Sequence, residues 1–189
     1  MLEFNFETWY AKDEKPSEWL VGNLSNLNKV ELKTNTKLFL LKGFPRDAPL
    51  YIFFNKENEC LWVESITKGW LHEGYDNYIQ FGSDGAGNPI CIDLNDNDSI
   101  WILDHDNDFE EIYINQKIDY YAQCLLVYKN FLYDIADKYG DDAWYDGLYK
   151  ENDIIDLKKS FEQIDKTIFD VYKSYWRLTI DDLLAFMKT

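Results

Sequence analysis

The sequence has few cysteines, no long apolar run and no apolar leader. Its three cysteines cannot all pair with one another, and we expect them to be reduced and buried: Cys60, Cys91 and Cys124. The longest apolar runs, such as 38–41 and 50–54, are far too short to cross a bilayer. Glu3 and Glu7 stand where a secretory leader would be basic and then apolar. We therefore expect a cytoplasmic protein.

Basic residues are absent from one quarter of the chain. Residues 69–116 contain 11 acids and no lysine or arginine, and so carry −11 of the net charge of −16. A second acidic run, 134–156, has eight acids against Lys138 and Lys150. Such a surface would repel nucleic acid and anionic lipid, so neither is an expected partner. The charge favours a cationic partner, most simply a basic protein. The alternative is that these acids only occupy turns and strand ends.

Residues 1–48 are expected to form helices with breaks. Ser17 can cap a first helix, because the apolar residues after it recur near helical spacing: Leu20, Val21, Leu24 and Leu27. A second short helix is expected to begin at Thr34 or Thr36 and to end at Gly43.

Residues 49–115 are predicted to form a mostly antiparallel meander sheet of about six strands. Short runs rich in β-branched and aromatic residues are separated by Asn, Asp and Gly: 50–54, 60–65, 78–82, 89–94, 99–104 and 111–115. Ile90 and Ile92 alternate with Cys91, which indicates two differently packed faces. The Asn- and Asp-rich segment 95–98 is expected to be a hairpin loop, since both residue types tolerate left-handed backbone.

Residues 116–189 are predicted to be helical. Helical patterns cover 118–139, 153–165 and 165–176. Thr179 with Asp182 resembles a capping box that would begin the last helix. No linker or internal repeat divides the chain. The sequence therefore predicts one α+β domain, 1–189, in which the sheet is flanked by N-terminal and C-terminal helices.

His105 is the one candidate for acid–base chemistry. It follows a predicted strand and lies between Asp104 and Asp106, the kind of neighbour that a catalytic histidine uses. No serine or cysteine nucleophile with a recognisable local motif accompanies it. A polar histidine at a strand end is the favoured interpretation.

Two motifs resemble ligand-binding loops but lack essential residues. The Asp-x-Asp-x-Asp run at 104–108 begins like a calcium loop, but Phe109 replaces its glycine and Asn115 its bidentate glutamate. The glycine-rich segment 82–88 lacks the Lys-Ser/Thr pair of a phosphate loop and precedes a strand. Its glycines are expected to serve a tight connection between strands. We therefore expect no metal and no cofactor.

Aromatic residues make up 17 % of the chain, and most of them should lie in the core. Five rings lie beside acidic residues, and we expect them to divide between core and partner contact: Tyr75, Tyr78, Trp144, Tyr145 and Tyr149.

Two adjoining segments carry a family resemblance. FGSDGAGNPICIDL at 81–94, followed by IWILDHD at 100–106, resembles the central signature of the SUKH superfamily, whose fold is shared with the yeast cell-wall assembly regulator. Three flanking segments resemble its fourth subgroup: 38–45, the helix that begins near Ile118, and 161–176. The resemblance covers about residues 35–185, and the first 34 residues depart from it.

The resemblance implies a binding module without enzymatic activity. Bacterial members are similar to immunity proteins of polymorphic toxin systems, which bind and neutralise a toxin domain, often a nuclease. Because a nuclease site is basic, the acidic composition points independently to the same kind of partner. The expected contacts are Asp84, Asp96, Asp98, Asp104, Asp106, Asp108, Glu110, Glu111, Tyr75, Tyr78, Trp144 and Tyr145. The alternatives are a regulatory scaffold like the yeast relative and an enzyme that uses His105.

Overall fold

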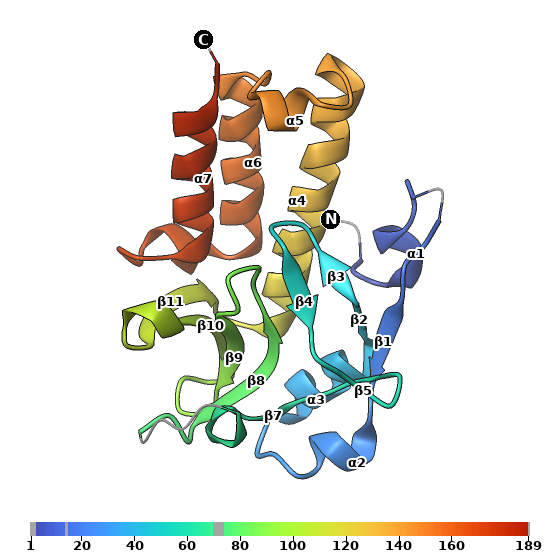
Figure 1. Ribbon diagram of the computed structural model, residues 1–189, viewed down its shortest axis with the longest axis vertical. Helices are drawn as coiled ribbons and strands as arrows, with labels where there is room; N and C mark the ends of the chain where they lie inside the picture. The colour runs from blue at the N-terminus through green and yellow to red at the C-terminus, as the bar shows by residue number, and fades with distance from the viewer. Residues whose placement is uncertain (1–2, 14, 70–73, 189) are drawn as a thin grey trace.

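The computed structural model describes residues 3–13, 15–69 and 74–188, and its fold is α+β (Figure 1). Its strands form a seven-stranded and a four-stranded sheet. The three long helices stand side by side above the larger sheet in Figure 1: α4 (Ile118–Tyr139), α6 (Glu151–Ile164) and α7 (Tyr175–Phe186). The N-terminal elements, drawn in blue, lie to one side. The predicted fold class, an α+β protein with a mostly antiparallel sheet, is confirmed.

The larger sheet has the order β11-β10-β9-β8-β4-β3, and β7 also pairs with β8. Its strands are β3 (Asp47–Ala48), β4 (Ile52–Phe54), β7 (Glu64–Ser65), β8 (Tyr78–Ser83), β9 (Pro89–Asp93), β10 (Ser99–Asp104) and β11 (Glu110–Asn115). Strands β8 to β11 form the predicted antiparallel meander. Asn97 and Asp98 adopt left-handed backbone in the β9–β10 turn, with φ of 61° and 64°, as the hairpin prediction requires.

A second sheet has the order β2-β1-β6-β5. Its strands are β1 (Trp19–Gly22), β2 (Phe44–Pro45), β5 (Lys56–Glu57) and β6 (Cys60–Leu61). Strand β1 pairs in parallel with β6 and antiparallel with β2. The predicted run 60–65 is therefore divided, because β6 lies in this sheet and β7 in the larger one.

The helices predicted at about 34–42, 118–139 and 153–165 are all present. The α-helices are α1 (Phe6–Trp9), α2 (Leu24–Leu27), α3 (Thr34–Lys42), α4 (Ile118–Tyr139), α5 (Ala143–Asp146), α6 (Glu151–Ile164) and α7 (Tyr175–Phe186). Short 3-10 helices are η1 (Ile66–Lys68), η2 (His105–Asn107) and η3 (Lys166–Phe169). Gly43 and Gly140 end α3 and α4 with φ of 97° and 107°, where other residues would be strained. None of the described helices is both long enough and apolar enough for a membrane span.

The predicted helix after Ser17 is wrong, because this segment forms strand β1. The Ser17 hydroxyl lies 2.8 Å from the Tyr10 hydroxyl and caps no helix. Asn23 begins a helix instead, since its side chain accepts the Ser25 backbone N–H at 2.9 Å. Residues 1–48 therefore contain strands β1, β2 and β3 as well as helices, which corrects the expectation of helices alone.

The predicted start of the last helix is also wrong. Helix α7 begins at Tyr175, and the Ser174 hydroxyl accepts the Arg177 backbone N–H at 3.3 Å. Thr179, the expected cap, lies inside α7 and donates its hydroxyl hydrogen to the Tyr175 carbonyl at 2.9 Å. The pattern at 165–176 forms η3 followed by turns and bends in place of a continuous helix.

The two faces of the larger sheet contact different apolar clusters, as the alternation in β9 predicts. Ile90 and Ile92 belong to the main core, which lies between the sheet and the helices. Cys91 points to the other face, into a smaller cluster. That cluster contains Ile66, Tyr78, Cys91, Leu103 and Phe109. All three cysteines are free; Cys91 and Cys124 are buried as expected, whereas Cys60 is partly exposed.

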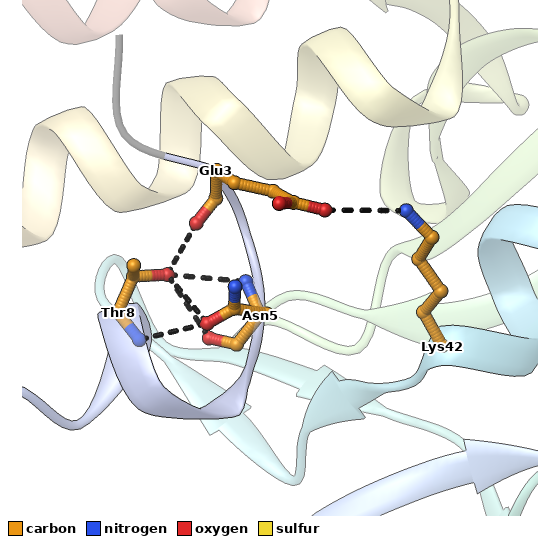
Figure 2. Close-up of polar contacts among 4 residues, drawn as sticks. All are labelled: Glu3, Asn5, Thr8 and Lys42. Atoms are coloured by element: carbon orange, nitrogen blue, oxygen red, sulfur yellow. Dashed lines mark hydrogen bonds and ion pairs between the residues drawn. The ribbon is translucent and has the colours of Figure 1, made fainter.

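Residues 3–8 form both local and long-range polar contacts. Asn5 and Thr8 form a capping box at α1, in which each side chain accepts the other's backbone N–H. Glu3 lies 3.4 Å from the Lys42 ammonium at the end of α3 (Figure 2). The capping box is thus local, whereas the exposed Glu3–Lys42 pair reaches a helix distant in the sequence.

Candidate functional site

Two hairpin loops of the larger sheet meet at the Asn88 side chain. The β8–β9 loop contains Asn88, and the β10–β11 loop begins at His105. Asn88 Oδ1 accepts the His105 backbone N–H at 3.0 Å and lies 2.7 Å from His105 Nδ1. The same amide donates from Nδ2 to Asp84 Oδ2 at 3.0 Å. The structure therefore brings Asp84 to the β10–β11 hairpin, which holds five of the seven other acids predicted as contacts.

Asp84 also organises its own loop. One carboxylate oxygen accepts the backbone N–H groups of Ala86 and Asn88, at 3.0 and 2.8 Å. Gly87 completes the turn with φ of 92°, a conformation that favours glycine. Gly87 thus serves a tight connection between strands, as predicted, whereas Gly82 lies within β8.

Five predicted contact acids gather on the β10–β11 hairpin, and we call them the acidic corner: Asp104, Asp106, Asp108, Glu110 and Glu111. Three of the side chains are exposed: Asp106, Asp108 and Glu111. Asp104 accepts the Asp106 backbone N–H at 3.2 Å and so caps η2. Glu110 forms an ion pair with Lys173, which precedes α7. The corner therefore presents three exposed carboxylates on one short hairpin.

Two other predicted contacts, Asp96 and Asp98, lie at the opposite end of the strands. Asp98 is only 3 % exposed and accepts the Lys33 backbone N–H at 2.7 Å, which fixes the segment before α3. Asp96 accepts the Ser99 hydroxyl hydrogen at 2.7 Å within the β9–β10 turn. The prediction of Asp98 as a partner contact is wrong, because this carboxylate is used inside the fold. Asp96 stays exposed but lies apart from the acidic corner.

The tyrosines predicted beside the acids divide between core and surface. Tyr78 is buried in the smaller apolar cluster, so its prediction as a contact is wrong. Burial raises the pKa of Tyr78 strongly, and the neighbouring Glu111 carboxylate raises it further. Tyr75 is half-buried at the same corner, where its hydroxyl lies 3.4 Å from the Phe109 carbonyl. Burial and then the Glu111 and Asp108 carboxylates raise the Tyr75 pKa.

A cavity of about 870 Å³ opens beside the two loops, and we call it the aromatic cavity. Ile102 on β10 and Ile112 on β11 are paired residues that line it from the sheet side. Helices α4, α5 and α7 supply further lining residues. Seven aromatic rings line the cavity: Tyr51, Tyr128, Trp144, Tyr145, Tyr149, Tyr175 and Phe186. Asn88 and Asp84 line it too, so it adjoins the junction of the two hairpin loops.

Trp144 and Tyr145, both predicted contacts, therefore lie on the aromatic cavity and away from the hairpin itself. Their rings are perpendicular, with centroids 4.8 Å apart and an interplanar angle of 78°. Tyr145 is 66 % exposed, whereas Tyr149 is buried and donates its hydroxyl hydrogen to the Leu183 carbonyl at 3.1 Å. Of the five rings chosen from the sequence, Tyr78 and Tyr149 are therefore buried, whereas Tyr75, Trp144 and Tyr145 are partly or largely exposed.

His105 faces neighbours that hold its ring in place. Its Nδ1 contacts Asn88 Oδ1, and its Nε2 lies 3.3 Å from the exposed carboxylate of Asp106. The Asn88 contacts to both the backbone N–H and the ring of His105 join the two loops. Among the described residues, no group of three or more His, Cys, Asp or Glu side chains could hold a metal ion.

A lysine held by aromatic rings is a feature that the sequence analysis missed. Lys129 on α4 lies 4.6 Å from the Trp9 ring centroid and 5.0 Å from that of Tyr10. Its ammonium donates to the Trp9 carbonyl at 2.6 Å and forms an ion pair with Asp13. Burial lowers the Lys129 pKa even though Asp13 raises it. The partners are separated by more than 100 residues, so spacing along the chain gives no signal of this contact.

Comparison with protein-family models, with curated proteins and with solved structures finds no match to this chain. Function must therefore be argued from the acidic corner and the aromatic cavity themselves.

Proposed function

We propose that this protein binds a cationic protein, and that it acts as an immunity protein that neutralises a basic toxin domain. The observation that carries the proposal is the acidic corner: Asp106, Asp108 and Glu111 are exposed on one hairpin, within a 48-residue segment that has no lysine or arginine. The resemblance of 81–94 and 100–106 to the SUKH superfamily supports an immunity role within this proposal.

The acidic corner would act mainly on the rate of encounter. Like charges held together produce a field that attracts a basic partner, and such steering can raise association rate constants to about 10⁸ M⁻¹s⁻¹. Exposed carboxylates contribute little to the lasting affinity, since water and salt screen them. Aromatic side chains near the hairpin would slow the dissociation of the complex, because large rings at an interface bury much apolar area.

Survival on co-expression tests this proposal. The chain is expressed together with the toxin domain encoded by a neighbouring gene, and colony formation is scored. We expect protection by the wild-type chain and weaker protection by a variant with three neutralised acids: Asp106→Asn, Asp108→Asn and Glu111→Gln. A control variant carries the same change in net charge on other exposed acids: Glu31→Gln, Glu57→Gln and Asp137→Asn. No protection by the wild type, or equal protection by both variants, would contradict the proposal.

A further inference from the structure

We propose that the aromatic cavity receives an arginine or lysine side chain of the cationic partner. This inference rests on the proposed function and assigns a site to it. The cavity of about 870 Å³ has the size of a ligand pocket and exceeds what one side chain fills, so neighbouring backbone of the partner can enter with it.

The charged residues that line the aromatic cavity favour a cationic ligand. Asp84 and Asp182 line the cavity, and among the described lining residues there is no lysine, arginine or histidine. Each carboxylate lies near a tyrosine of the lining: Asp84 adds to the effect of burial in raising the pKa of Tyr175, and Asp182 does the same for Tyr128. The negative groups are thus distributed around the cavity, where they complement a positive side chain.

The rings favour the same ligand. The face of a tryptophan or tyrosine ring attracts an ammonium or guanidinium group, and the perpendicular rings of Trp144 and Tyr145 both line the cavity. The chain already uses this chemistry elsewhere, since Lys129 is held by the rings of Trp9 and Tyr10 together with a carboxylate. The aromatic cavity offers the same groups without a cation of its own chain among the described residues.

The mouth of the cavity suits a protein partner better than a small metabolite. Tyr51 and Tyr145 are 64 % and 66 % exposed, and Phe186 is also exposed at the rim. Large exposed rings next to a pocket are typical of protein interfaces. Leu50 and Tyr51 have φ of 67° and 57°, an unfavourable conformation for non-glycine residues, and this turn places the Tyr51 ring beside the cavity. The cavity is also continuous with the hairpin junction through Asn88.

The test uses N-acetyl-arginine amide as the probe and N-acetyl-norleucine amide as its uncharged counterpart. Each is titrated while the Trp144 indole N–H signal is followed by NMR. We expect saturable shifts with arginine amide and binding about five- to tenfold weaker with norleucine amide, the range expected of a cation–π contact. Equal binding of the two probes, or no saturable shift with arginine amide, would overturn the inference.

Two variants locate the binding. Tyr145→Ala removes an exposed lining ring, and Asp182→Asn removes a lining charge; each is expected to weaken arginine amide binding about threefold or more. Tyr172→Ala is the matched control, because this tyrosine is 95 % exposed and does not line the cavity. Equal effects of the two tyrosine variants would overturn the inference. The probes need no toxin, so a negative result here leaves the co-expression test of the proposed function unaffected. Failure of the co-expression test likewise does not contradict binding of arginine amide at this site.

Discussion

Asn88 Oδ1 lies 2.7 Å from His105 Nδ1, and this contact joins two hairpin loops whose carboxylates form the candidate site. The same oxygen accepts the His105 backbone N–H, while Nδ2 donates to Asp84. One amide side chain thus holds the acidic corner beside the aromatic cavity. The exposed carboxylates of the acidic corner thus have a fixed position in the fold.

Removal of the Asn88 side chain should loosen this junction. Asn88→Ala deletes the contacts to His105 and Asp84, and we expect the free energy of unfolding to fall by about 1–2 kcal/mol. Hydrogen exchange of the His105 amide should become faster, because its acceptor is lost. Urea unfolding and amide exchange measure these effects. Asn95→Ala, in the exposed turn at the other end of the strands, is the control and should change stability by less than about 0.5 kcal/mol. Equal effects of the two variants would show that Asn88 has no special role.

Lys129 should contribute much more to stability than a second lysine that joins the same parts of the chain. Lys129→Met leaves the largely buried Asp13 carboxylate without its ammonium partner, and we expect a loss of about 2–4 kcal/mol. Lys12→Met removes a solvent-exposed pair with Asp134 and should cost about 0.5 kcal/mol or less. Thermal and urea unfolding of both variants compare them. Similar losses would contradict the idea that burial makes the difference.

The β8–β11 meander and the helices α3 and α4 could be predicted because their signals are local. The alternation of Ile90, Cys91 and Ile92 identifies the two faces of β9, and Gly43 and Gly140 end α3 and α4 where expected. The spacing of apolar residues and the residues that end a helix are both defined within a few positions of the chain. A single sequence is therefore enough to recognise them.

Two of the errors came from contacts between residues that are distant in the sequence. Ser17 has the side chain of a helix cap, but Tyr10 engages its hydroxyl and β1 pairs with β2 and β6. Asp98 lies in a segment with the composition of a surface turn. Its carboxylate nevertheless accepts the Lys33 backbone N–H, 65 positions away in the chain, and so lies inside the fold. The distribution of charge along the sequence therefore predicted an acidic site, but it did not predict which carboxylates remain available to a partner.

Another polar group missed by the sequence analysis is a buried hydroxyl without a partner. The Tyr121 hydroxyl is buried and has no hydrogen-bond partner among the described residues, so Tyr121→Phe should leave the free energy of unfolding unchanged or raise it by about 1 kcal/mol. Tyr149→Phe is the matched comparison, because it removes a hydrogen bond to the Leu183 carbonyl and should cost about 1 kcal/mol. Urea unfolding measures both changes. A larger loss for Tyr121→Phe than for Tyr149→Phe would contradict this assignment.

Asp153 should make stability depend on pH. Burial raises the pKa of its carboxyl, but hydrogen bonds from Lys138, Tyr139 and the Lys150 backbone outweigh burial, so the pKa lies below its ordinary value of 3.8. The carboxylate therefore stabilises the fold above pH 3.8, and this contribution is lost as the pH falls through the lowered pKa. Asp153→Asn should cost about 1 kcal/mol at neutral pH and progressively less as the pH falls below the ordinary carboxyl range.

Urea unfolding of the wild type and Asp153→Asn across that pH range gives the comparison. Asp137→Asn is the control, because Asp137 lies exposed on the same helix as Lys138 and Tyr139. Its effect should stay small at every pH. A constant difference between wild type and Asp153→Asn would contradict the lowered pKa.

The association rate constant with the purified toxin domain tests most directly whether the acidic corner captures a cationic partner. Stopped-flow fluorescence at low and physiological salt compares the wild type with the two triply neutralised variants, which have equal net charge. We predict that neutralisation of Asp106, Asp108 and Glu111 slows association about tenfold at low salt and removes most of its salt dependence. The control changes at Glu31, Glu57 and Asp137 should slow it about twofold or less. Equal slowing by both variants would contradict the account, because only the total charge and not its position on the hairpin would then matter.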